Sequence, residues 1–296
     1  RMAIDKFAIV SCRDAQSLRI ERCWLTIRNA AHFPGVAFVR ANAVGHSDAL
    51  ASGPAMDEQK PLDVRLEDCV IRGEATFLIT TDQQPVRLFW KNGLLATPER
   101  LIQLRGVGTA VGSDLDRSPM QVDLQHLTAY VGQGLLLADG LSDGASPPAW
   151  LTCHDSIVIA DSDAALIECV GTGYADHLDD LLVWQGDRNF YEGLRVFLLV
   201  RRGLDGPARQ IDFQQWQELW TPPSRGHENL PRRGAVGWRN PVPPARPTDL
   251  HTPEDYTLAE RDEQSPAHGG ATDGRDVGLL PITLPTENLP RDNLQP

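Results

Sequence analysis

The amino-acid sequence predicts an all-β protein whose short strands stack in parallel as the coils of a parallel β-helix (β-solenoid), with a Pro-rich C-terminal extension. Strand-forming stretches recur with a period of very roughly 20 to 30 residues, which is what one coil of three short strands needs. The breaks between them are often too short for a long crossover, and they lack the regular Asn-Gly or Asp-Gly pairs of two-residue hairpins. An antiparallel sandwich of many short strands is the alternative.

The coil pattern is clearest in residues 182–202. An alternating strand leads into a polar corner at residues 185–189, and Phe190 with Tyr191 forms a second short apolar piece. A tight turn then precedes a third alternating strand at residues 196–200. The same order of pieces can be laid over residues 18–40, 64–80, 86–104, 122–137 and 150–169.

Small and polar residues at strand ends fit this plan. Four asparagines follow predicted strands, at positions where a left-handed backbone bend would suit Asn: Asn29, Asn42, Asn92 and Asn189. Small buried thiols are expected where cysteines end or interrupt apolar alternations, at Cys23, Cys69, Cys153 and Cys169. Disulfides are the alternative for these cysteines.

Composition narrows the partners. The 296 residues are 41% apolar, so the chain can bury a core, and the net charge of −12 disfavours nonspecific attraction to nucleic acid or anionic membranes. No apolar run approaches the roughly 20 residues of a membrane helix. The five cysteines lack metal-site spacing such as C-x-x-C, so neither a metal nor a cofactor is expected. A polysaccharide or another protein is the expected kind of partner.

The chain divides into a β-helix over residues 1–220 and an extension over residues 221–296 that is rich in Pro, Arg and Gly at its start. Residues 7–12 already resemble a strand with no capping helix before them, so we expect the β-helix to be truncated at its N-terminal end. Residues 211–220 predict a strand that leads into a short helix with Phe213, Trp216 and Trp220 on one face. Surface loops are expected at residues 43–61, 106–119 and 139–148.

Three motifs carry a family resemblance: WKNGLL at residues 90–95, LQHLTAYV at 124–131 and GDRNFYEG at 186–193. They resemble the right-handed parallel β-helix region of large planctomycete proteins, several of which are described as serine/threonine protein kinases. The resemblance covers about residues 7–220 and implies a right-handed β-helix that serves as an accessory region of a multidomain protein. Kinase activity does not follow, because this sequence has no glycine-rich phosphate loop, no HRD-type catalytic loop and no DFG.

A second resemblance lies near the C-terminus. Residues 265–267, followed by Gly274 and residues 276–278, look like the closing motif of many bacterial β-helix proteins, in which a final segment packs after the last coil. His268 stands where an apolar residue is expected. The resemblance implies that residues 256–284 are partly ordered and packed on the solenoid.

Acidic clusters are candidates for a ligand or acidic surface, since polysaccharide-cleaving β-helices gather carboxylates on one strand face. One predicted loop holds Asp114 and Asp116, and a second holds Asp176, Asp179 and Asp180. Loop aspartates also serve as turn formers and solvated charges. The remaining candidate ligand residues form the polar corner Asp187, Arg188 and Asn189, in which a local ion pair and a backbone bend are the alternatives to binding.

Histidines and aromatics offer two further possibilities. His126 and His154 end strands at similar positions of adjacent coils, near Asp155, so a His-Asp pair could act as base and orienter, or the histidines could simply hydrogen-bond at strand ends. Sugar stacking or filling of the coil interior are the alternatives for Trp90, Trp184 and Tyr191.

The leading functional hypothesis is a noncatalytic scaffold or recognition module of a larger, possibly kinase-containing protein. The alternative is a carbohydrate-active lyase or glycosidase of the pectin-lyase-like type, and a sensor region for an attached kinase is a third reading. An enzyme should gather two carboxylates, or a carboxylate with Arg or His, in a groove on one strand face. A noncatalytic module should leave these groups scattered, without a groove.

Overall fold

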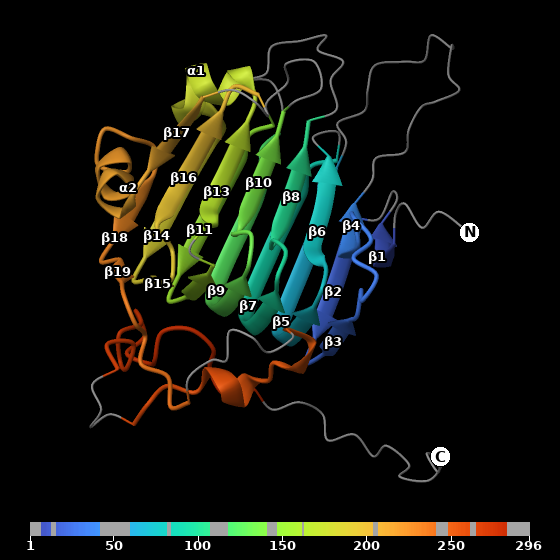
Figure 1. Cartoon of the computed structure of the whole chain (residues 1–296), viewed down its shortest axis with the longest axis vertical. Helices are drawn as coiled ribbons and strands as arrows, with labels where there is room; N and C mark the ends of the chain where they lie inside the picture. The colour runs from blue at the N-terminus through green and yellow to red at the C-terminus, as the bar shows by residue number, and fades with distance from the viewer. Residues whose placement is uncertain are drawn as a thin grey trace.

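The computed structural model describes residues 7–12, 16–41, 60–81, 84–106, 118–140, 147–161, 163–203, 207–240, 248–260 and 265–282. Strands dominate these residues and form two long sheets that face each other, with helices at the end that follows the last strands (Figure 1). The expected loop insertions and residues 114 and 116 fall largely or wholly outside this part of the chain.

The chain passes repeatedly through the two sheets, and each such passage is called a round. Each round adds one strand to sheet A, except the last complete one, which adds two. Neighbouring strands pair in parallel, except that the last one runs antiparallel to the strand before it. In sheet order the strands are β1 (Ala8–Cys12), β4 (Ala37–Ala41), β6 (Thr76–Thr81), β8 (Ile102–Arg105), β10 (Leu136–Asp139), β13 (Ala165–Val170), β16 (Val196–Arg201) and β17 (Ala208–Ile211).

Sheet B contains three 12-residue strands at its centre, β5 (Leu62–Gly73), β7 (Val86–Thr97) and β9 (Met120–Val131). Two shorter strands take the place of each long one toward the sheet ends. These pairs are β2 (Ser17–Glu21) with β3 (Trp24–Ile27), β11 (Ala149–His154) with β12 (Ile157–Ala160), β14 (Leu182–Asp187) with β15 (Phe190–Glu192), and β18 (His227–Asn229) with β19 (Arg232–Arg233).

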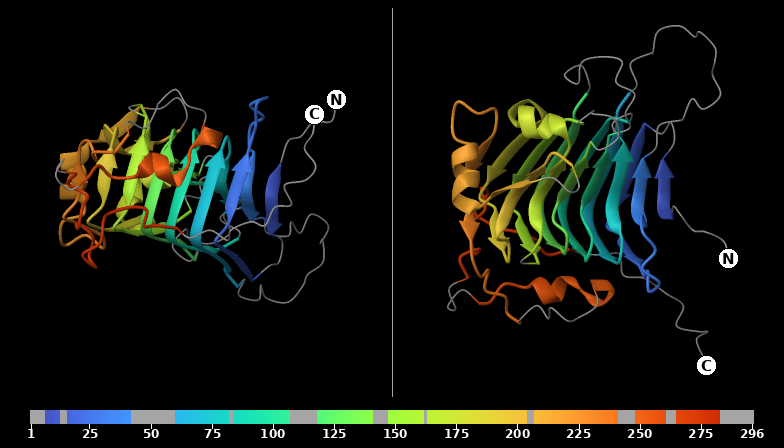
Figure 2. Two further views of the ribbon diagram at one scale, coloured as in Figure 1. Left: turned by 90° about the horizontal axis from the view of Figure 1, so that it is seen from below. Right: turned by 45° about the horizontal axis from the view of Figure 1, so that its top comes forward.

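Each round passes along sheet B, then along sheet A, and returns to sheet B one strand further on with the same register. Leu66 lies beside Trp90, Trp90 beside Leu124, and Leu124 beside Cys153. The prediction of an all-β fold of parallel strands is therefore confirmed, and the antiparallel sandwich is wrong. Figure 2 shows strands of successive rounds lying side by side in the sheets.

Sheet B bends at one residue in each round, and that residue has a left-handed backbone. We call the strand residues before the bend the first half of sheet B and those after it the second half. The bend residues have φ between 48° and 54° and are Arg22, Asp68, Asn92, His126, Asp155, Arg188 and Leu230. Of the asparagines expected to bend the chain, Asn92 does so, Asn29 and Asn189 do not have positive φ, and Asn42 lies outside the described residues.

The core lies between the sheets and is filled by the inward side chains of successive rounds. Trp90, Trp184 and Tyr191 are completely buried, so of the two alternatives expected for them they fill the interior and do not offer a sugar-stacking surface. Phe77 lies 5.0 Å from Trp90, centroid to centroid. The cysteines are free thiols, and burial raises the pKa of Cys153 and Cys169. The alternative of disulfides is therefore not realised.

Two α-helices accompany the last rounds. The predicted short helix is α2 (Phe213–Leu219), where Asp212 forms a capping box with Gln215 and Trp216 is fully buried. The other is α1 (Thr172–Leu181), which contains Asp176, Asp179 and Asp180. Its three aspartates therefore lie on a helix, and the prediction that they occupy a loop is wrong. None of the described helices is long and apolar enough to cross a membrane.

Residues 234–240, 248–260 and 265–282 cover the outer face of the second half of sheet B (Figures 1 and 2). Two 3-10 helices, η2 (Thr248–Leu250) and η3 (Pro253–Tyr256), lie in this part of the chain. A second apolar cluster, separate from the main core, joins Val236, Tyr256 and Val277 to strand residues such as Leu94 and Ile157. We call residues 265–282 the strap, since they run across several rounds.

Candidate functional site

The outer face of the first half of sheet B carries many polar and aromatic side chains, arranged in rows across neighbouring strands. In this half every second residue points into the core, as the alternating burial of β5, β7 and β9 shows, so the residues between them point outward. We call this surface the groove face. In register, one row across it contains Asp63, Arg87, Gln121, Trp150 and Val183. A second row contains Arg65, Phe89, Asp123, Thr152 and Gln185. A third contains Glu67, Lys91, Gln125, His154 and Asp187.

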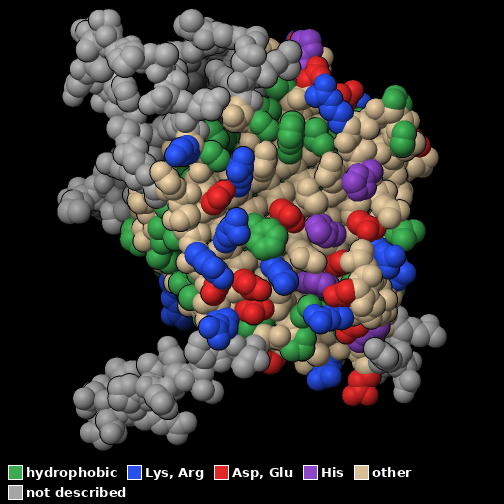
Figure 3. All heavy atoms as spheres, turned by 180° about the vertical axis from the view of Figure 1, so that it is seen from behind, with side chains coloured by type: hydrophobic (Ala, Val, Ile, Leu, Met, Phe, Trp, Pro, Cys, Tyr) green, Lys and Arg blue, Asp and Glu red, His purple; other side chains and the backbone are tan. Residues whose placement is uncertain are grey.

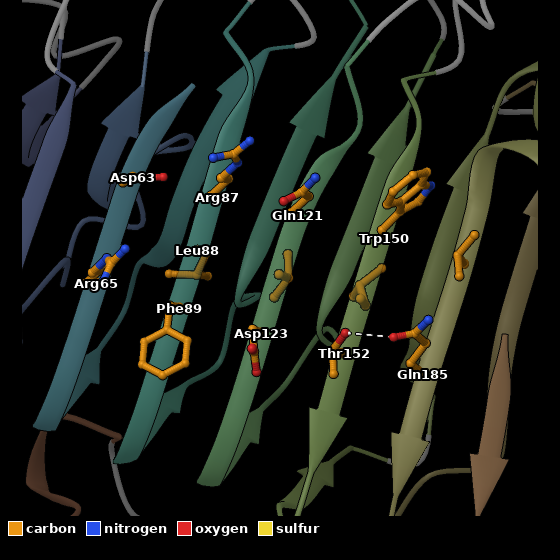
Figure 4. A pocket seen from close by; sticks show the side chains of 13 residues that line it. Asp63, Arg65, Arg87, Leu88, Phe89, Gln121, Asp123, Trp150, Thr152 and Gln185 are labelled. Atoms are coloured by element: carbon orange, nitrogen blue, oxygen red, sulfur yellow. Dashed lines mark hydrogen bonds between the residues drawn. The ribbon is translucent and has the colours of Figure 1, made fainter. Parts of the chain in front are cut away.

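A groove of about 490 Å³ is hollowed over the first two rows. Figure 4 shows the side chains of β5, β7, β9, β11 and β14 that line it, with Phe89 and Trp150 on either side of Gln121 and Asp123. The Trp150 side chain is 43% exposed, and that of Phe89 is half-buried. The groove therefore offers two accessible rings with hydrogen-bonding groups between them.

Charges of both signs line the same groove. Arg65 and Arg87 are exposed, while Asp63 and Asp123 are half-buried. Figure 3, a view from behind, shows basic, acidic and His side chains interspersed over this side of the molecule. The groove has no single dominant sign, in contrast to the net charge of the whole chain.

A His-carboxylate pair stands at the edge of the groove. His154 Nε2 lies 3.4 Å from Asp123 Oδ1. The hydrogen bond to Asp123 raises the pKa of His154, although partial burial opposes this shift. At neutral pH the imidazole is thus drawn toward its charged form, which holds it against the Asp123 carboxylate.

The candidate aspartates of α1 do not meet in this groove. Asp176 forms an ion pair with Arg202, Asp180 lies 3.6 Å from Arg225, and Asp179 is exposed. These are solvated surface pairs, which contribute little to stability.

The polar corner at the end of β14 serves several purposes. Asp187 belongs to the third row of the groove face and accepts a hydrogen bond from Asn229 at 2.9 Å. Arg188 is the bend residue, 3.9 Å from Asp187 Oδ1. Asn189 is buried, accepts from Ser156 N and donates to Cys153 O, so it holds two rounds together. Of the three, only Asp187 faces the groove side.

The two histidines are not equivalent, and the prediction that they stack at similar positions is wrong. His154 lies in register with Gln125, whereas His126 is the bend residue one position further on, level with Asp155. His126 Nε2 faces Asp273 Oδ2 of the strap at 3.4 Å. Asp155 is buried and accepts from Thr272 N and Oγ1, so it orients the strap.

Sequence reasoning missed the groove residues, although a signal existed. The outward positions of residues 62–67, 86–91, 120–125 and 149–154 hold Arg, Asp, Phe and Trp in register from one round to the next. These rows appear when the sequences of successive rounds are aligned on their outward-facing positions instead of on their apolar positions. Among the described residues, no group of three or more His, Cys, Asp or Glu is arranged to hold a metal ion.

Comparison with known proteins adds no assignment. No family model, no curated protein and no solved structure matches this chain.

Proposed function

We propose that the chain is a right-handed parallel β-helix that acts as a noncatalytic recognition module of a larger protein and binds an extended polysaccharide along the groove face. The register-matched rows of parallel strands support the β-helix, and the strong preference of parallel crossovers for the right-handed form supports its hand. The proposal also keeps the likeness to β-helix regions of large, kinase-containing planctomycete proteins, which rests on the three sequence motifs alone.

The observation that carries the binding proposal is the pairing of Trp150 and Phe89 across Gln121 and Asp123. Sugars are recognised by aromatic rings that pack on their C–H faces and by planar polar groups that bind their hydroxyls. Stacked strands place such groups at regular intervals of about 4.8 Å, so the surface suits a chain-like ligand better than a compact one.

The spacing of the carboxylates favours recognition over hydrolysis. Asp63 and Asp123 lie two strands and two positions apart in register, which separates their Cα atoms by about 12 Å at ordinary strand spacings. Retaining glycosidases hold their two carboxyl groups about 5 Å apart and inverting ones about 6.5 to 9.5 Å apart. Arg87 lies beside Asp63 in the first row, on the strand between those of the two aspartates, and Asp123 lies in the second row beside Phe89.

A lyase or glycosidase of the pectin-lyase-like type is the second candidate. One specific observation favours it: Asp123, with His154 at 3.4 Å, lies in the same groove as Arg65 and Arg87. This is the carboxylate, His and Arg combination expected of an enzyme. In a lyase, a basic group would remove a proton next to a carboxylate while cations neutralise the developing charge.

The experiment is a glycan-binding screen with the Trp150→Ala variant. Trp24 is the matched control, because its side chain is 40% exposed on β3, outside the groove. Trp150→Ala should weaken binding to the polysaccharide identified for the parent chain by about tenfold, through loss of ring packing, and Trp24→Ala should not. Equal binding by both variants would refute the proposed groove. Cleavage of the bound polysaccharide, lost in Asp123→Asn, would establish the enzyme instead.

A further inference from the structure

A second cavity, of about 320 Å³, lies between the last bend of sheet B and the strap. Its polar lining comes from Arg188 and Arg232, and its apolar lining includes Phe190, Leu230 and Val277. The cavity is on the opposite side of the bend from the groove face, so it is separate from the proposed polysaccharide site.

The two guanidinium groups approach the cavity from adjacent strands. Arg188 lies level with Leu230, and Phe190 pairs in register with Arg232. Strands of one sheet are about 4.8 Å apart, so both long side chains reach a single small ligand.

Each guanidinium is held by one carbonyl of the strap. Arg188 Nη1 donates to Ala271 O at 3.1 Å, and Arg232 Nη1 donates to Pro266 O. The Nε atom of Arg188 is buried and has no hydrogen-bond partner among the described residues. The carboxylate of Asp187, at 3.9 Å, is beyond hydrogen-bond length. A buried donor without a partner is costly, and Arg188 lines the cavity, where an anion would pair with its guanidinium group.

Leu230 is an unusual residue for its position. The other six bends carry Arg, Asp, Asn or His, whereas Leu230 places a large apolar side chain on a left-handed backbone with φ of 48° and is 60% exposed. A left-handed non-glycine backbone costs about 1 kcal/mol or more, and such strain concentrates at functional sites. The leucine forms an exposed apolar rim beside the two arginines.

We propose that this cavity binds a small organic carboxylate with an apolar body. The planar carboxylate matches the guanidinium fork, and the apolar body packs on Leu230 and on the side chains of Phe190 and Val277. An inorganic oxyanion would satisfy the arginines but would leave the apolar wall without a partner, so the site distinguishes the two.

Calorimetry with the full chain tests the proposal with three probes: benzoate, inorganic phosphate and benzyl alcohol. Benzoate should bind with a Kd of about 1 mM or tighter, and the other two at least about tenfold more weakly. Absence of saturable benzoate binding up to about 20 mM would overturn the proposal. Tighter binding of phosphate than of benzoate would also overturn it, because the site would then select oxyanions in general and not an organic carboxylate.

Variants at Leu230 separate charge from folding. Asp and Asn both tolerate the left-handed backbone and have the same shape, so Leu230→Asp and Leu230→Asn differ only in the carboxylate placed at the rim. Leu230→Asp should bind benzoate about tenfold more weakly than Leu230→Asn. Arg232→Gln should show a similar loss of affinity, measured well below its melting temperature because the change also removes the Arg232–Pro266 hydrogen bond. Equal affinities in the two Leu230 variants, or parental affinity in Arg232→Gln, would refute the site.

Discussion

Trp216 on α2 donates its indole N–H to Glu228 Oε2 on β18 at 2.9 Å, which joins the short helix to the last strand of sheet B. The same oxygen accepts from Trp184 Nε1 at 2.5 Å and from the Tyr191 hydroxyl at 3.1 Å. Glu228 Oε1 is buried without a hydrogen-bond partner among the described residues. Burial raises the pKa of Glu228 to about 7, even though the three donors lower it.

The first prediction concerns stability and pH. The pKa of Glu228 is about 7 in the folded protein and near 4.5 in the unfolded chain. The protonated carboxyl therefore stabilises the folded state fully below pH 4.5, and this stabilisation is lost as the pH rises through about 7. The free energy of unfolding should fall by roughly 3 kcal/mol over this range, because a shift of one pKa unit corresponds to about 1.36 kcal/mol. Urea unfolding should therefore show a more stable protein at pH 5 than at pH 8. Glu228→Gln, which cannot ionise, should flatten this difference, and an unchanged pH profile in that variant would contradict the assignment.

The second prediction concerns a bend. Asn92 donates to Asp68 Oδ1 at 2.7 Å and accepts from Leu280 N at 2.9 Å, and its own backbone is left-handed. Asn92→Ala should cost about 2 to 4 kcal/mol, since it removes two buried hydrogen bonds and strains the backbone.

Asn92→Gly is the matched variant, because glycine relieves the strain but also loses the bonds. Chemical denaturation should place it between the parent and Asn92→Ala. Equal stability of the alanine and glycine variants would show that the left-handed backbone at residue 92 does not destabilise a non-glycine residue.

The third prediction concerns the strap. Asp155 accepts from Thr272 N at 2.7 Å and Oγ1 at 2.6 Å, and its carbonyl accepts from Gly278 N at 2.7 Å. Asp155→Ala should release residues 271–280 before the strands unfold, because both side-chain hydrogen bonds of the carboxylate go to the strap. The left-handed backbone of residue 155 adds about 1 kcal/mol of strain at the bend in the alanine variant. Hydrogen exchange of the strap amides should accelerate at least about tenfold, which corresponds to about 1.4 kcal/mol.

Thr272→Val provides the comparison for the strap, since it deletes only the hydroxyl bond and keeps the backbone one. Its exchange rates should fall between those of the parent and Asp155→Ala. Uniform acceleration across the sheets in Asp155→Ala would mean that the carboxylate supports the whole fold instead.

The fourth prediction concerns close packing beneath the tryptophans. A Cβ atom at Gly186 would lie 2.4 Å from Glu228 Oε1 and 2.5 Å from Trp184 Nε1, whereas one at Gly203 would meet nothing within 4 Å. Gly186→Ala should therefore destabilise the protein by about 1 to 3 kcal/mol. Gly203→Ala should leave the melting temperature nearly unchanged, and a similar loss in both variants would show that packing at Gly186 is not the cause.

Much of the fold could be predicted because its signals are local and repeated. Alternation within residues 182–202 marks β14, β15 and β16, and the spacing of Phe213, Trp216 and Trp220 marks α2. Apolar periodicity also identifies which side chains enter the interior in the first halves of β5, β7 and β9, where burial alternates along the strand.

The bends and the groove were harder to predict for a physical reason. A left-handed backbone is set by where the stacked strands must turn, so even Arg188 and Leu230 adopt it, although residue type alone favours Asn. The groove depends on contacts between rounds, as with Asp123 and His154, and register between rounds is a tertiary property. The α1 aspartates drew attention because they are adjacent in sequence, which says little about convergence in space.

Every round has a bend at the same level of sheet B, and this repetition allows rounds to be added or removed in evolution. Since each round re-enters sheet B at the same backbone angle, inserting or removing a round shifts the next one by about 4.8 Å without altering its internal geometry. The area of the groove face thus scales with the number of rounds, and duplication of a single round is sufficient to extend it.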